Sequence, residues 1–166
     1  MGGSCMSGIE DRIATTTDWL DRAMIDLEDA RTILASRDRD LDNVAFLCRQ
    51  SVEKLIKGFL VAHGVGFPKI HDIARLLDEF IHQIDADLAD RADAARNLNV
   101  YAVASRYPEF SEAIDPSTGQ LLVGIAEDAW ALFEPRIRKV IVSVHDEAGP
   151  GPSDEASAKD ADDADA

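Results

Sequence analysis

The sequence has few cysteines and no long apolar run, and both absences narrow what the protein can be. Its 166 residues include only Cys5 and Cys48, which make neither a disulfide framework nor a metal site. No uninterrupted apolar stretch approaches the ~20 residues needed to cross a bilayer, and the beginning of the chain lacks a basic region followed by an apolar one. We therefore expect a cytoplasmic protein with no membrane contact, no metal and no cofactor.

Positive charge is also scarce. The chain carries 17 Lys and Arg against 32 Asp and Glu, a net charge of −15. Eight of the acidic residues fall in residues 146–166, where Lys159 is the only base, and such a segment, rich in Gly, Pro, Ser and Ala, cannot bury enough apolar surface to order itself. The rest of the chain is acidic too. A broad basic surface for DNA is therefore excluded, and any anion site must be local.

Apolar residues recur at steps of three and four, which is the pattern of amphipathic helices, and no segment alternates as a strand would. The pattern predicts an all-α, antiparallel bundle of about five helices with disordered ends. Thr15 to Thr17 are candidate caps of the first helix, and Pro135 is expected to kink the last one. The expected helices cover approximately 18–36, 42–63, 71–84, 87–104 and 121–144. The expected organisation is a flexible leader at 1–16, a helical domain at 17–145 and an acidic disordered tail at 146–166.

The most informative segment is 42–77, in which a long helix with one apolar stripe is followed by a glycine loop. The other faces of that helix are crowded with polar side chains: Arg49, Gln50, Glu53, Lys54 and Lys57. The loop 64–68 stops the helix, a His71-Asp72 pair opens the next one, and an Arg106-Tyr107-Pro108 triplet closes the penultimate helical region. In this order the parts resemble the HEPN domain, a small helical family of bacteria and archaea. The resemblance covers roughly residues 18–144.

One activity that the resemblance implies is RNA cleavage. Catalytic HEPN proteins are metal-independent ribonucleases in which an arginine, a polar residue and a later histidine meet across a dimer. The only match to that spacing is Arg75 with His82, and Leu76, a core position, stands where the polar residue belongs. Both side chains are also explained as solvated residues of an amphipathic helix. We therefore expect no catalytic residue, and Arg75 and His82 remain the candidates of an alternative, a dimeric ribonuclease toxin.

The residues that carry the resemblance are better site candidates. Lys54, Lys57 and His71 could gather at an anion, with Arg106 adding a bidentate guanidinium and Tyr107 a ring or a hydroxyl. The alternative is structural: Glu53 would pair with Arg49, Lys57 or Arg106, and His71 would cap the third helix. These five residues, Lys54, Lys57, His71, Arg106 and Tyr107, are the predicted site for a nucleotide or phosphate.

The last expectation concerns the proteins with which this chain associates. HEPN proteins of this kind resemble one half of a toxin-antitoxin pair whose other half is a minimal nucleotidyltransferase. The sequence has no Gly-Ser with spaced aspartates on a strand, so transferase chemistry would come from that partner. We expect a homodimer or such a heteromer, with an interface made of residues off the inward stripe of the last helix: Leu121, Trp130, Leu132 and Ile137. The sequence thus predicts a non-catalytic binding module, with RNA as a ligand only under the ribonuclease alternative.

Overall fold

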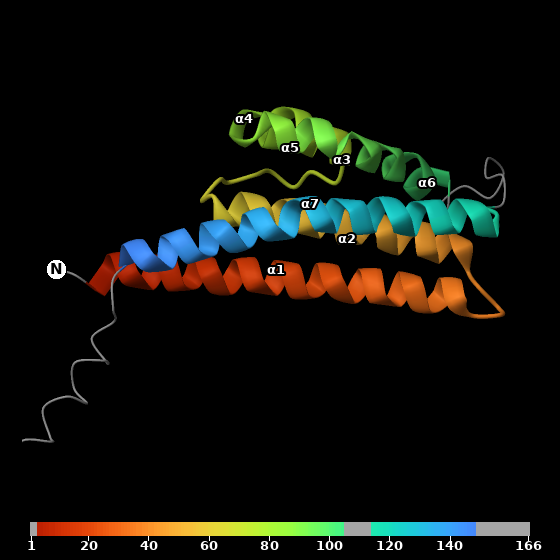
Figure 1. Ribbon diagram of the computed structural model, residues 1–166, viewed down its shortest axis with the longest axis horizontal. Coiled ribbons are helices and arrows are strands. Elements are labelled where there is room, and N and C mark those ends of the chain that lie inside the picture. Colours follow the sequence, from red (N-terminus) through yellow and green to blue (C-terminus); the bar gives the residue numbers. More distant parts are fainter. Residues whose placement is uncertain (1–2, 105–113, 149–166) are drawn as a thin grey trace, which may run out of the picture.

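The fold is built on three long helices that lie side by side. The computed structural model describes residues 3–104 and 114–148, with side chains described for 8–101 and 114–146. The long helices are α1 (Gly3–Ala35), α2 (Leu41–Ala62) and α7 (Pro116–Ala148). Figure 1 shows α1 antiparallel to both α2 and α7, which run in the same direction along it.

A layer of shorter helices covers the side of α2 and α7 that faces away from α1 (Figure 1). It consists of two segments that fold back on each other, 73–84 and 86–104. The first is α3 (Ile73–Leu76), the π-helical turn η1 (Leu77–Ile81) and α4 (His82–Ile84), and the second is α5 (Ala86–Arg91), the 3₁₀ turn η2 (Asp93–Asn97) and α6 (Leu98–Ala104). With the three long helices this makes five helical regions and no strand in the described part of the chain. The predicted all-α bundle is confirmed.

Aspartates start most of these helical regions. In each, a carboxylate oxygen accepts the backbone N–H three residues later, which satisfies a donor that the first turn leaves free. The four aspartates are Asp40, Asp72, Asp85 and Asp115, bonded to the amides of Asn43, Arg75, Leu88 and Thr118. The short connections between the regions are therefore fixed by local hydrogen bonds.

The first helix begins much earlier than its apolar pattern predicts. α1 starts at Gly3 and runs through most of the segment expected to be a flexible leader. The expected threonine caps are wrong, since Thr16 and Thr17 lie inside the helix and donate hydrogen bonds to the carbonyls of Arg12 and Ile13. Figure 1 shows the early turns of α1 beside the end of α7, a tertiary contact that supports a helix whose own pattern is thin.

The core lies where α1, α2 and α7 meet. Phe59 of α2 and Phe133 of α7 contact edge to face, with ring centroids 5.5 Å apart. Gly58 lets α1 approach closely, since a Cβ there would lie 3.2 Å from the Cβ of Trp19. Cys48 is fully buried in this core, and burial raises the pKa of its thiol to about 12. Cys48 is therefore the inert core residue that the sequence predicts.

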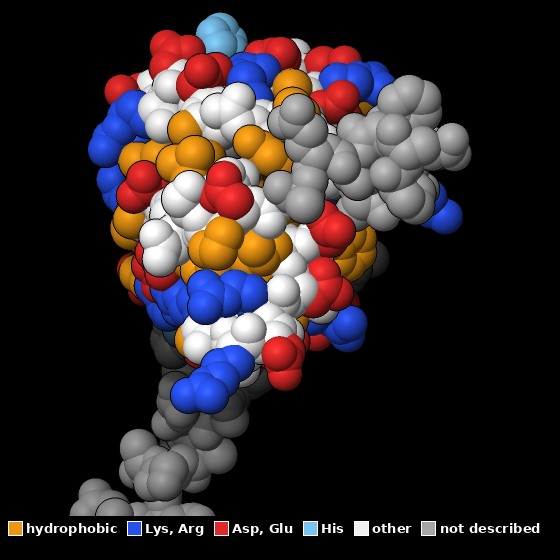
Figure 2. Space-filling view, turned by 90° about the vertical axis from the view of Figure 1, so that its right-hand side faces the viewer, with side chains coloured by type: hydrophobic (Ala, Val, Ile, Leu, Met, Phe, Trp, Pro, Cys, Tyr) orange, Lys and Arg blue, Asp and Glu red, His pale blue; other side chains and the backbone are white. Residues whose placement is uncertain are grey.

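Most of the expected interface residues of α7 point inward. Ile137 is fully buried, Leu132 packs against the core, and Trp130 is partly buried with its Nε1 donating to Ser51 Oγ over 3.1 Å. Only Leu121 is exposed, at 60%. The expectation was wrong for Ile137, because α7 contacts both α1 and α2 and its buried surface is wider than one stripe. For Leu121, Trp130 and Leu132 an interface role stays a prediction. Figure 2 shows the end of the bundle where α7 begins, with hydrophobic side chains gathered between charged ones.

In the described parts of the chain, no helix combines the length and the apolar character that crossing a bilayer requires.

Ser51 joins all three long helices, and we expect Ser51→Ala to destabilise the protein by about 2 kcal/mol. Its Oγ donates to the carbonyl of Ala23 over 2.7 Å and accepts from Trp130 Nε1, so removing it leaves the indole N–H without this partner and the Ala23 carbonyl with only its bond inside α1. Urea unfolding followed by circular dichroism measures the change. Ser143→Ala is the matched control, because the exposed Ser143 hydroxyl bonds only within α7. Equal midpoints for the two variants would contradict the prediction.

Candidate phosphate site at the Glu53 cluster

The carboxylate of Glu53, in the middle of α2, collects three cationic or polar partners. Arg49 Nη1 donates to Glu53 Oε2 over 2.7 Å, and Lys57 Nζ donates to Oε1 over 2.7 Å. His71 Nδ1 lies 2.9 Å from the same Oε1, and it must be the donor because an ionised carboxylate only accepts. Arg49 and Lys57 stand one helical turn on either side of Glu53, so α2 itself positions this Glu53 cluster: Arg49, Glu53, Lys57 and His71.

Three of the four side chains are almost completely buried. Arg49, Glu53 and Lys57 are 6, 3 and 5% exposed, so together they hold one more positive than negative charge away from water. Aromatic rings shelter the cations: Lys57 Nζ lies 5.8 Å from the ring centroids of both Trp19 and Phe67. Among the described residues, Arg49 Nε is the one buried side-chain nitrogen or oxygen without a hydrogen-bond partner. The interior of the Glu53 cluster is therefore locally electropositive in an acidic protein.

The pKa of the Glu53 carboxyl is lowered from its ordinary value of 4.5. Burial alone would raise this pKa, because it penalises the charged form. Hydrogen bonds from Lys57 and His71, together with the charges of Lys57 and Arg49, outweigh the burial and favour the ionised carboxylate. Glu53 is therefore a fixed anion that organises its cations, and it is unsuited to act as a proton donor near neutral pH.

His71 is the exposed part of the Glu53 cluster. Its side chain is 71% exposed, while its backbone carbonyl accepts from Arg49 Nη1 over 3.1 Å. The structural alternative in which His71 caps the third helix is wrong, because Asp72 accepts from the amide of Arg75, and Asn99 accepts from the amide of Ile73. With those amides occupied, the start of α3 offers little to an anion. The accessible group is His71 Nε2, which donates a hydrogen bond when the imidazole carries protons on both nitrogens.

The other predicted site residues lie elsewhere or outside the description. Lys54 points to a different partner: its Nζ donates to Asp26 of α1 over 2.6 Å, so it does not share an acceptor with Lys57. Arg106 and Tyr107 lie outside the described residues. Trp19 and Phe67, the two aromatic residues that cover Lys57, were not predicted from the sequence. Both are far from Lys57 in sequence, with Trp19 on another helix and Phe67 in the loop after α2, so no spacing pattern points to them.

Arg75 and His82 have separate surroundings on the surface. The guanidinium of Arg75 donates two hydrogen bonds to Glu79, over 2.8 and 3.0 Å, and these bonds raise the arginine pKa further above its ordinary range. His82 is exposed on α4 and makes no hydrogen bond to Arg75. Leu76, the residue after Arg75, is completely buried, as expected for a core position. The pair shows no arrangement suited to proton transfer in the described structure.

Comparison with known proteins agrees with this architecture. A family model described as HEPN domain matches residues 16–135, well over half of the chain. The chain belongs to the HEPN family. No curated protein and no solved structure gives a significant match. Within this HEPN domain, the described residues contain no group of three or more His, Cys, Asp or Glu side chains that could hold a metal ion.

We expect Glu53→Gln to destabilise the fold by about 3 kcal/mol, because it leaves Arg49 and Lys57 buried without a counter-charge. The effect should depend on pH. Since the pKa of Glu53 is lower in the folded protein than in the unfolded chain, its ionised form stabilises the fold above pH 4.5, and this contribution is lost as the pH falls through the folded value. Urea unfolding from pH 7 to pH 3 should therefore show a smaller loss of stability in the variant.

Glu79→Gln is the matched control for this prediction. Glu79 also pairs with an arginine four residues away, but Arg75 and Glu79 are 56 and 46% exposed, so we expect little change in the unfolding midpoint. Similar unfolding midpoints for the two variants at pH 7 would contradict the prediction. They would show that the buried ion pairs of Glu53 stabilise the fold no more than the exposed pair of Glu79.

Proposed function

We propose that this HEPN protein is a non-catalytic binding module that holds a phosphate group of a nucleotide at His71. The observation that carries the proposal is the Glu53 cluster, in which two buried cations face one carboxylate beneath an exposed imidazole. A phosphate oxygen bonded to His71 would lie close to the excess positive charge, which attracts an anion more strongly in a partly desolvated place than in bulk water. Arg106 and Tyr107 belong to this proposed site as well.

The surroundings of Arg75 and His82 favour binding over catalysis. A ribonuclease of this family would use an arginine to stabilise the developing charge on the phosphate. The guanidinium of Arg75 is instead held by both carboxylate oxygens of Glu79, so a substrate would have to compete with an ion pair. Among the residues with described side chains, none forms a hydrogen bond with the His82 ring. We therefore propose that this module recognises phosphate without cleaving RNA.

Pairing with another chain completes the proposal. The exposed Leu121 and the hydrophobic side chains at the same end of the bundle (Figure 2) offer apolar surface for a homodimer. The alternative partner is a minimal nucleotidyltransferase in a toxin-antitoxin system, which would present its own nucleotide to the Glu53 cluster. A short nucleotidyltransferase reading frame beside this gene would favour the heteromer over the homodimer.

Nucleotide binding should depend on His71 and not on other surface histidines. We expect His71→Ala to weaken ATP binding about tenfold or more, because a charge-assisted hydrogen bond contributes ~1.5–3 kcal/mol. Isothermal titration calorimetry at low salt measures the affinity, and thermal unfolding checks that the fold is intact. The control is His82→Ala, which removes an exposed imidazole of the same helical layer. Unchanged affinity in the His71 variant, or no ATP binding by the wild type, would refute the proposal.

We also expect the purified protein to leave a mixed pool of RNA intact. Incubation with labelled RNA in the presence of a chelator, followed by gel separation, tests for metal-independent cleavage. The contrary result would be cleavage by the wild type that Arg75→Ala and His82→Ala each abolish. Glu79→Gln sharpens the test, because it frees the Arg75 guanidinium from its carboxylate partner and would increase any cleavage that uses Arg75.

A further inference from the structure

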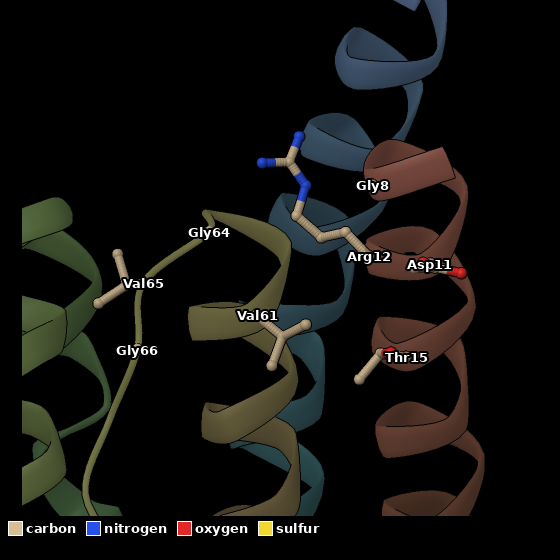
Figure 3. Close-up of a pocket in the computed structure, with 8 residues that line it drawn as sticks. All are labelled: Gly8, Asp11, Arg12, Thr15, Val61, Gly64, Val65 and Gly66. Atoms are coloured by element: carbon tan, nitrogen blue, oxygen red, sulfur yellow. The ribbon is translucent and has the colours of Figure 1, made fainter. Parts of the chain in front are cut away.

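A pocket lies at the end of α2, between the early turns of α1 and the loop after α2. Its volume is about 320 Å³, and it is a shallow depression that is largely open to solvent. Its walls come from two parts of the chain: Gly8, Asp11, Arg12 and Thr15 from α1, and Val61, Gly64, Val65 and Gly66 from the end of α2 and its loop (Figure 3). None of these residues belongs to the Glu53 cluster, so this pocket needs its own explanation.

Arg12 supplies the charge of this pocket. Figure 3 shows its side chain reaching from α1 towards Gly64, while the side chain of Asp11 points away to the other side of α1. Among the described residues, the Arg12 guanidinium makes no ion pair and no hydrogen bond. A guanidinium at the mouth of a pocket, turned away from its nearest acidic neighbour, is suited to hold an oxyanion by two parallel hydrogen bonds.

Glycines keep the loop side of the pocket open. Gly64 has φ of +68°, a conformation that side chains disfavour, and a Cβ there would lie 3.1 Å from Arg12 Nη1. A Cβ on Gly66 or on Gly8 would meet nothing within 4 Å. The amide of Gly66 donates no backbone hydrogen bond within the described residues. The loop therefore leaves space beside the arginine, and one amide of the loop has no backbone acceptor among the described residues.

The remaining walls are apolar or weakly polar. Figure 3 shows Val61 and Thr15 pointing towards each other across the gap between α2 and α1, and most of the lining surface is apolar. A small molecule in such a shallow depression gains apolar contact on one side, and a few polar groups fix its orientation. Here the polar groups gather at one end, around Arg12.

We propose that this pocket binds a small molecule with one oxyanion head, phosphate or carboxylate, and a partly apolar body. Arg12 holds the head beside the Gly64 to Gly66 loop, and Val61 and Thr15, which face each other in Figure 3, contact the body. The site is separate from the one proposed at His71, since the two share no residue. A ligand here fastens the beginning of α1 to the end of α2, so its binding also stabilises the fold.

The test follows the backbone amide signals of the Gly64 to Gly66 loop by two-dimensional NMR while a probe is added to the full chain. Three probes are used: inorganic phosphate, AMP and hexanoate. We expect at least one to shift the loop signals with saturation, and Arg12→Gln to weaken that binding about tenfold or more. Saturation by AMP alone identifies a phosphate on a larger body as the head group, and saturation by hexanoate alone identifies a carboxylate.

Two glycine variants test the space in the pocket. Gly66→Leu places a side chain where the structure has open space, and we expect it to weaken binding while the thermal midpoint stays the same. Gly124→Leu is the matched control, because a Cβ there also meets nothing within 4 Å, but on α7. No saturable shift with any probe overturns the proposal, and so does full affinity in Arg12→Gln.

The His71→Ala variant separates this proposal from the previous one. We expect it to leave the shifts of the loop signals unchanged, even where it removes ATP binding at the Glu53 cluster. If His71→Ala abolishes the loop shifts, the pocket is not an independent site and the proposal fails. If Arg12→Gln alone abolishes them, this pocket stands whether or not the His71 site binds ATP.

Discussion

The rest of this molecule depends on the ion pairs that the buried Glu53 carboxylate makes with its neighbours. Among the described residues, Glu53 is the one acid that pairs with the two buried cations, Arg49 and Lys57, and the loop that leads to α3 is attached to α2 through His71. Burying charge is expensive unless every charged group is matched. One carboxylate thus decides the environment of the proposed phosphate site and the attachment of the layer of short helices.

The fold could be predicted from the sequence because its main signals are periodic. Apolar residues at steps of three and four identify α2 and most of α7, and the aspartates that start the later regions supply local start signals. The beginning of α1 could not be found in this way. Its early turns owe their helical structure to α7, which is more than a hundred residues away in sequence, and no local pattern records such a contact.

For a similar reason, only part of the candidate site could be predicted from the sequence. The i,i+4 spacing of Arg49, Glu53 and Lys57 is visible in the sequence, but their burial depends on Trp19 and on the loop residue Phe67, which cover Lys57 only in three dimensions. Lys54 shows the opposite: the sequence places it next to Glu53, but the fold does not. It follows Glu53 directly, yet a helix turns successive side chains by about 100°, so Lys54 reaches Asp26 of α1 instead.

The π-helical turn η1 changes the geometry of the segment that carries Arg75 and His82. Seven residues apart on a regular α-helix, two side chains return to nearly the same face. η1 lies between these two residues and is wound with wider hydrogen-bonded rings. Leu77 and Ile81 of this turn are both completely buried. Because a π-helical turn contains more residues than an α-helical one, the rule of 100° per residue does not hold across it. The sequence spacing of Arg75 and His82 therefore does not by itself place the two side chains on one face of the helix.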